Sequence, residues 1–114
     1  MLDCKEVAKV LGKSKLNTMK LAVLLYLGTV GEAKLTEIAK ALNTSKSVVW
    51  KHVKEMKEKE LVSVRYTLGA HPQMVVKITP KGLKELLKYA ELLEAVSRCA
   101  REGVEGSESE GESL

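Results

Sequence analysis

The chain has 114 residues, of which 45% are apolar and 4% aromatic, and its formal net charge is +4. This length gives room for one domain with one core, and the longest apolar run, residues 21–27, is far too short to cross a membrane. The N-terminus has no apolar signal core, so we expect a cytoplasmic protein. Lys and Glu dominate the charged residues, a composition that resembles that of proteins from hyperthermophiles.

Charge is distributed unevenly along the chain. Residues 103–114 carry four glutamates and no base, so the residues before them carry a net charge of +8. A basic body with a short acidic tail favours a polyanionic partner, although a lysine-rich soluble surface explains the charge equally well.

The first part of the chain predicts helices over residues 3–11 and 18–28. The first helix is amphipathic, whereas the second is apolar almost all round and should lie at the centre of the core. Gly28 suits the left-handed position at the end of the second helix. A connector over residues 31–34 then leads to Leu35, which we interpret as a very short edge strand.

Two short helices joined by a tight turn follow. Thr36 is the predicted cap of a helix that runs to about Leu42, and residues 43–44 form the turn. Ser45 is the predicted cap of the next helix, which runs to about Lys59. A helix-turn-helix of this kind presents its second helix to the major groove of DNA.

The next segment predicts a hairpin of two strands. Residues 61–66 alternate and are rich in β-branched side chains, residues 67–73 contain Gly and Pro, and residues 74–78 form the return strand. The sequence therefore predicts a β-hairpin directly after the helix-turn-helix.

A long helix closes the predicted fold. It begins at Thr79-Pro80, a cap followed by proline, and its apolar residues repeat at three and four positions as far as about Arg101. We therefore predict one domain over residues 1–102 and a disordered acidic tail over residues 103–114.

The order of these elements resembles the winged helix-turn-helix fold, and within it the MarR-like and ArsR-like transcriptional regulators, including small archaeal ones. The resemblance is carried by residues 35–56, by KEKELVSVRY at 57–66 and by KITPKGLKELL at 77–87. It implies a mainly α fold with a two- or three-stranded β-wing and a long C-terminal dimerisation helix. It also implies a DNA-binding regulator rather than an enzyme.

This sequence departs from the family pattern at two places. Glu60 stands where the family commonly has the glycine that ends the second helix of the motif. The wing carries Arg65, His71 and Lys77 as its cations, which is few for a wing that grips DNA strongly.

The second helix of the motif predicts two faces. Val49, Val53 and Met56 follow the i, i+4, i+7 spacing and should pack on the core, so the opposite face is free for a groove. Lysines on that face suit phosphate contacts, and since it has no Arg, Asn or Gln we expect modest base specificity. The residues that we predict to contact double-stranded DNA are Thr36, Ser45, Lys46, Ser47, Val48, Trp50, Lys51, Lys54, Arg65 and His71.

Trp50 and His52 each allow two interpretations. Trp50 either lies exposed for a partner or folds back over the first helix of the motif as peripheral core. His52 flanks the core stripe and is expected to be a half-buried packing residue rather than a ligand or a switch.

A regulator of this kind should be a homodimer, because two copies can bind two half-sites of DNA. The predicted dimer surface comes from the last helix and the first, through Val7, Leu11, Leu86, Leu87, Leu93 and Val96. Cys4 and Cys99 lie on the same two helices, and a disulfide between them, within one chain or between two, is a further hypothesis. No ligand for an effector site is specified by the sequence.

Two other functions remain open. A winged helix can serve as a protein-interaction module, and a lysine-rich, arginine-poor contact face also suits a general chromosome-coating protein. The sequence has no hydrolase or phosphate-loop motif, no Cys/His cluster for a metal and no signature for a cofactor, so we predict none of these.

Overall fold

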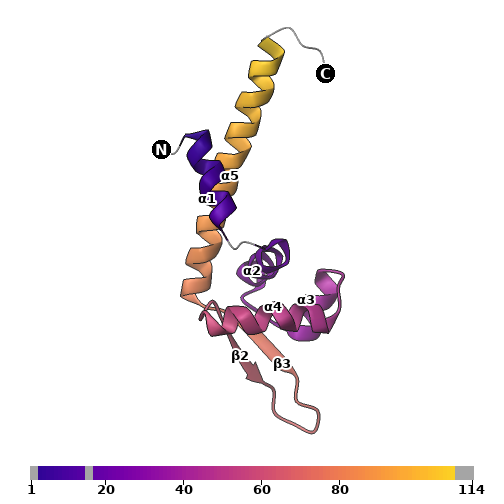
Figure 1. Ribbon diagram of the computed structural model, residues 1–114. Coiled ribbons are helices and arrows are strands. Elements are labelled where there is room, and N and C mark those ends of the chain that lie inside the picture. The colour runs from indigo at the N-terminus through magenta and orange to yellow at the C-terminus, as the bar shows by residue number, and fades with distance from the viewer. Residues whose placement is uncertain (1–2, 15–16, 110–114) are drawn as a thin grey trace. The chain divides into compact units, whose positions relative to one another are not determined.

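The computed structural model describes residues 3–14 and 17–109, with side chains as far as residue 104. Its elements in chain order are α1 (Cys4–Lys13), α2 (Thr18–Val30), β1 (Glu32–Lys34), α3 (Leu35–Ala41), α4 (Lys46–Glu58), β2 (Val62–Tyr66), β3 (Met74–Ile78) and α5 (Pro80–Ser109) (Figure 1). A mainly α chain with a three-stranded sheet and a long C-terminal helix confirms the predicted fold class.

The chain divides into two compact units. The central unit comprises Leu16–Leu87, and the terminal unit comprises Met1–Lys15 together with Lys88–Leu114. The central unit therefore holds the helix-turn-helix, the sheet and the first turns of α5.

The core of the central unit is built from aliphatic side chains of α2, α3, α4 and β3. On α4 the predicted stripe is confirmed, because Val49, Val53 and Met56 are at most 1% exposed. This stripe arises because residues spaced by three and four share one face of a helix. Its partners at the centre of the core are Val23, Leu24, Leu27, Ile38 and Val76.

Helix α2 is central to this core but longer than predicted. It continues past Gly28 to Val30, and Gly31, with a φ of 86°, closes it instead. Gly28 has a packing role, because a Cβ there would lie 2.9 Å from a methyl group of Leu86 on α5. Helix α2 is not buried all round, since Leu25 remains 58% exposed.

The connection from α2 into the helix-turn-helix differs from the prediction in two details. The edge strand is β1, Glu32–Lys34, and Leu35 is the first residue of α3 rather than a strand residue. Thr36 is accordingly inside the helix and does not cap it. The Glu37 carboxylate instead accepts a hydrogen bond of 2.8 Å from the Lys34 backbone N–H, which satisfies an amide that the helix leaves unpaired.

The sheet has the order β1-β3-β2 and is antiparallel throughout, and its register places alternate residues on two faces. The core face is formed by Val62, Val64, Val76, Ile78 and Ala33. Tyr66 and Met74, a directly opposed pair, continue this face toward the loop of the hairpin. The opposite face carries Ser63, Arg65, Lys77 and Glu32.

Helix α4 has well-defined ends. The Val48 N–H donates to Ser45 Oγ at 3.2 Å, which confirms the predicted cap. At the other end Leu61 N–H donates to Met56 O at 2.9 Å and Glu60 N–H donates to Lys57 O at 3.0 Å, the pair of bonds of a Schellman motif. Glu60 takes a φ of 63°, so this glutamate adopts the left-handed conformation that glycine provides elsewhere.

The start of α5 explains the sequence Thr79-Pro80-Lys81-Gly82. Thr79 Oγ1 accepts from the Gly82 N–H at 3.0 Å and lies 2.7 Å from Glu60 O, to which it donates. Gly82 packs directly against Leu61, because a Cβ at residue 82 would collide with the Leu61 carbonyl oxygen. The sequence predicts that Gly82 weakens this turn slightly, whereas its position shows that it permits the turn.

Helix α5 is longer than its predicted end near Arg101. It continues through Gly103 to Ser109, so the predicted disordered tail is wrong for residues 103–109, and residues 110–114 lie outside the described ranges. The extension contains two glycines, Gly103 and Gly106, each of which costs a helix about 1 kcal/mol, and it contains no proline. Although α5 has 30 residues, no helix in the described ranges is apolar enough over a sufficient length to cross a bilayer.

In the terminal unit, α1 is bonded covalently to α5. A disulfide joins Cys4 to Cys99 within the chain, with the two Cα atoms 5.8 Å apart. Val7 on α1 is 2% exposed, while Leu11 on the same helix is exposed. The terminal unit therefore has a small buried centre and an apolar surface beside it.

Candidate nucleic-acid interface

The face of α4 opposite the core stripe is exposed, as predicted. Lys46, Ser47, Lys51 and Lys54 are all classed as exposed, and Val48 is 39% exposed. This follows from the spacing, since burying residues 49, 53 and 56 turns these side chains outward. The central unit therefore presents a row of ammonium and hydroxyl groups on one helix, with an aliphatic residue near its beginning.

Trp50 lies between the two interpretations that the sequence leaves open. It is half-buried, so its ring is neither fully exposed nor part of the inner core. The structure thus gives Trp50 an intermediate position, with its side chain partly covered at the edge of the lysine-rich face.

Helix α4 is held against α2 by an ion pair on its other flank. Lys20 Nζ lies 2.7 Å from Glu55 Oε2, and the Lys20 side chain is only 16% exposed. The hydrogen bond and the positive charge of Lys20 lower the pKa of Glu55 below its usual value. His52 is half-buried as predicted, and among the described residues its buried Nδ1 atom has no hydrogen-bond partner.

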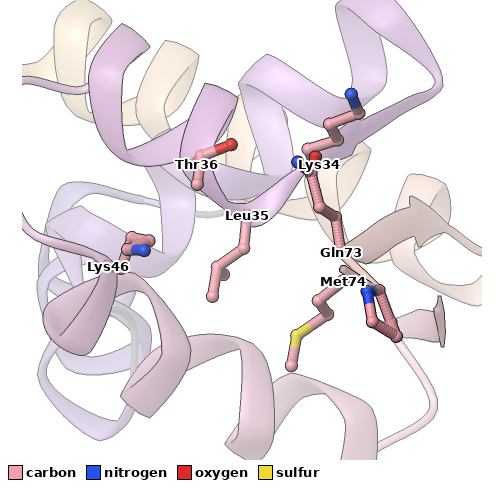
Figure 2. Close-up of a pocket in the computed structure, with 7 residues that line it drawn as sticks. Lys34, Leu35, Thr36, Lys46, Gln73 and Met74 are labelled. Carbon is pink, nitrogen blue, oxygen red and sulfur yellow. The ribbon is translucent and has the colours of Figure 1, made fainter. Parts of the chain in front are cut away.

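A recess of about 240 Å³ lies beside the start of α4. It is formed where the beginning of α3, the beginning of α4 and the return of the hairpin meet, and Figure 2 shows Leu35 and Met74 pointing into it, with Lys46 to one side. Its lining consists of Lys34, Leu35, Thr36, Lys46, Pro72, Gln73 and Met74. The structure thus brings predicted residues Thr36 and Lys46 together on one surface.

Sequence reasoning missed Lys34 and Gln73 at this recess. Lys34 falls in a segment interpreted as a connector, and Gln73 falls in a hairpin loop. Their proximity to Lys46 depends on the register of β1 and β3, which places Lys34 opposite Val75. A helix-turn-helix motif alone does not specify that register.

The two predicted wing residues, Arg65 and His71, do not line this recess. Arg65 is on the outer face of the sheet, where its guanidinium lies 2.6 Å from the Glu32 carboxylate. Both side chains remain partly exposed, so the charge of Arg65 is compensated without being buried. His71 is exposed in the hairpin loop.

No group of three or more His, Cys, Asp or Glu residues is arranged to hold a metal ion in the described part of the chain. The surface that the structure assembles is one of lysines, hydroxyls and backbone amides at helix starts. Such groups interact with phosphate oxygens and base edges.

Comparison with known proteins identifies the family and the fold. The sequence profile described as "Winged helix DNA-binding domain" matches residues 19–97. No curated protein sequence matches the chain closely enough to count as a relative.

Solved structures share the fold. A transcriptional regulator homologue from Pyrococcus horikoshii OT3 is 25% identical with a TM-score of 0.77, over 83% of this chain and 97% of that chain. A MarR family transcriptional regulator from Silicibacter pomeroyi is 24% identical with a TM-score of 0.65, over 82% of this chain and 62% of that chain. Bacillus subtilis PadR in complex with operator DNA is 18% identical with a TM-score of 0.58, over 65% of this chain and 47% of that chain.

Proposed function

Because the chain belongs to the winged helix DNA-binding domain family and has the fold of MarR-type regulators, we propose that it is a transcriptional regulator that binds double-stranded DNA as a homodimer. Helix α4 enters the major groove in this proposal. Its role is binding rather than catalysis.

The single observation that carries the proposal is the two-sided character of α4. One side is fixed in the core through Val49, Val53 and Met56, and the other presents exposed lysines. A helix supported in this way can approach the floor of a groove without giving up its own packing. Near its beginning, Ser45, Ser47 and Val48 have short side chains that permit close approach.

The roles of the individual residues follow from their chemistry. Lys46, Lys51 and Lys54 would contact phosphates, which position the protein and supply salt-dependent affinity. Ser47 and Val48 would face base edges, through a hydroxyl and through contact with thymine methyl groups. Ser45 Oγ already accepts a hydrogen bond from its own helix, so it would contribute by donating its hydroxyl proton.

The recess adds groups from α3 and the wing to the same surface. Lys34 and Thr36 at the start of α3 would contact the backbone on one side of the groove, next to Lys46. Arg65, paired with Glu32, would contribute less than its full charge. His71 would touch DNA from the wing loop.

Dimerisation would use apolar residues of α1 and α5. Leu11, Leu87 and Leu93 are 38%, 62% and 41% exposed, so they are available to a second copy. Val7 is already covered within the chain, and Leu86 is half-buried beside Gly28, so both would support the surface rather than form it. Sedimentation should give the mass of a dimer at micromolar concentration, and a stable monomer would contradict this part of the proposal.

The DNA proposal is tested by titrating the protein with promoter DNA and with random-sequence DNA across a salt series. A regulator should prefer some promoter sequence and should show a steep salt slope. Equal affinity for all sequences would favour a chromosome-coating protein. No binding at low salt would favour a protein-interaction module and would overturn the proposal.

A further inference from the structure

The loop of the β2–β3 hairpin holds one side chain fully in solvent. Leu68 is 99% exposed, whereas the other exposed large apolar side chains are between 38% and 62% exposed. A single exposed leucine is ordinary at a protein surface, but this one lies in the loop that joins β2 to β3. Figure 1 shows this hairpin extending beyond the helices of the central unit.

The base of the loop is closed by two hydrogen bonds. Thr67 N–H donates to Gln73 O at 2.8 Å, and Gln73 N–H donates to Thr67 Oγ1 at 2.8 Å. Leu68 follows immediately, and Gly69 then takes a φ of 122° that a side chain would resist. Leu68 therefore directly follows a residue, Thr67, that two hydrogen bonds to Gln73 hold in place.

The side chains at the end of the hairpin are mostly apolar, whereas a wing that binds phosphate would carry basic side chains. Arg65 is paired with Glu32, and Lys77 lies near the other end of β3. His71 is the one remaining titratable residue in the loop. Around it stand Leu68, Ala70 and Pro72, and the ring of Tyr66 is 61% exposed.

The hairpin also borders the surface that we propose for DNA. Pro72, Gln73 and Met74 line the same recess as Lys46 at the start of α4 (Figure 2). In the proposed complex, with α4 in the major groove, the hairpin beside its first turn would reach the adjacent minor groove.

We propose that Leu68 is an apolar wedge that enters this minor groove and partly unstacks a base step. This inference rests on the proposed function and specifies how the wing contributes to it. Apolar insertion kinks a duplex and favours steps that deform easily, such as TA. Sequence preference would then come partly from deformability, at a position read without a hydrogen bond.

The test compares the full-length protein with its Leu68→Ala variant on duplexes of about 30 base pairs, long enough for two half-sites. One duplex carries TA steps at the wing positions and the other carries GC steps. Binding is measured across a salt series, and bending is measured by energy transfer between dyes at the duplex ends. Truncating the leucine should weaken binding to the TA duplex about tenfold, reduce the bend and leave the salt slope unchanged.

Two matched variants complete the design. Leu68→Met keeps an apolar side chain of similar volume and should retain most of the affinity and bend. Leu25→Ala removes an equally apolar, 58% exposed leucine from α2 and should change neither.

The outcomes separate this inference from the proposed function. If Leu68→Ala binds and bends DNA like the wild type, while Lys51→Ala weakens binding, the wedge is wrong and the regulator proposal stands. A loss in Leu68→Ala that is equal on TA and GC duplexes, with no change in bend, would also overturn the wedge. If the wild type binds no DNA at low salt, both proposals fail together.

Discussion

Lys20 Nζ on α2 lies 2.7 Å from Glu55 Oε2 on α4, which ties the outer flank of α4 to the central helix of the core. Glu55 lies one turn after Lys51 on α4, on the flank that meets α2. The ion pair therefore complements the apolar stripe, since both restrain rotation of α4 about its own axis. That rotation determines which side chains face outward.

Glu55→Gln should make the stability of the protein less dependent on pH in the acid range. Because Lys20 lowers the pKa of Glu55 in the folded protein, the ion pair adds stability above the unfolded-state pKa of about 4.3, and this is lost as pH falls through the lower folded-state value. Urea unfolding should give the wild type a larger free energy of unfolding than the variant at neutral pH. At acid pH the two values should become equal. A constant difference would mean that the ion pair contributes no proton linkage.

Lys51→Ala and Lys54→Ala should each weaken DNA binding and reduce the salt slope by roughly one unit, because each removes one phosphate contact. Binding isotherms at several salt concentrations measure both effects. Lys84→Ala serves as the matched control, since Lys84 is an exposed lysine on another helix, α5, and is not among the predicted DNA contacts. Unchanged binding in both α4 variants would show that the face is assigned wrongly.

Glu60→Gly should stabilise the protein by about 1 kcal/mol, because glycine adopts the left-handed conformation at no steric cost. The lost ion pair is small, as Glu60 and Lys81 are 4.0 Å apart and both side chains are largely exposed. Glu60→Gln keeps the unfavourable backbone conformation and should change stability little. Thermal and urea unfolding compare the three proteins, and a destabilised glycine variant would contradict the explanation.

Gly82→Ala and Gly103→Ala should have opposite effects on stability although both lie in α5. At Gly82 the new methyl group meets the Leu61 carbonyl, so overpacking should cost about 1–3 kcal/mol. At Gly103 nothing lies within 4 Å of the added Cβ, and alanine should gain about 0.5–1 kcal/mol of helix propensity. Denaturant midpoints measure both, and equal gains would show that the approach to Leu61 relaxes freely.

Reduction of the Cys4–Cys99 disulfide should lower the free energy of unfolding by roughly 2–4 kcal/mol, since the bond restricts the unfolded chain over a separation of 95 residues. Unfolding with and without reductant measures the effect, and Cys4→Ser should match the reduced wild type. On a denaturing gel without reductant the wild type should run as a single chain. A band of two chains would show that the bond forms between copies.

Much of this fold was predictable because the short-range sequence patterns agree with the elements that the structure contains. The stripe of Val49, Val53 and Met56, the Ser45 cap and the strand that returns at Met74 each have a short-range cause in the sequence. The helix ends were less predictable. In the sequence, Gly28 is typical of a residue that ends a helix. In the structure the helix continues to its cap at Gly31, and Gly28 instead allows close packing against Leu86.

The candidate site was predictable for α4 and less so around it. The exposed lysines follow from helical spacing, whereas the recess depends on the pairing of β1 with β3, which brings Lys34 and Met74 together. The ion pair of Arg65 with Glu32 joins β2 and β1, which are not neighbours in the sheet, so no local sequence pattern predicts it. Contacts of this kind are set by tertiary register, which a single sequence encodes only weakly.

The hydroxyl of Thr79 connects the end of α4 rigidly to the start of α5. Thr79 Oγ1 bonds the carbonyl of Glu60, just beyond α4, and the amide of Gly82 in the first turn of α5. Neither helix terminus can pivot without breaking one of these bonds or forcing Gly82 away from Leu61. A torque applied to the first turn of α5 is therefore passed directly to the C-terminal end of α4, with no compliant linker to absorb it.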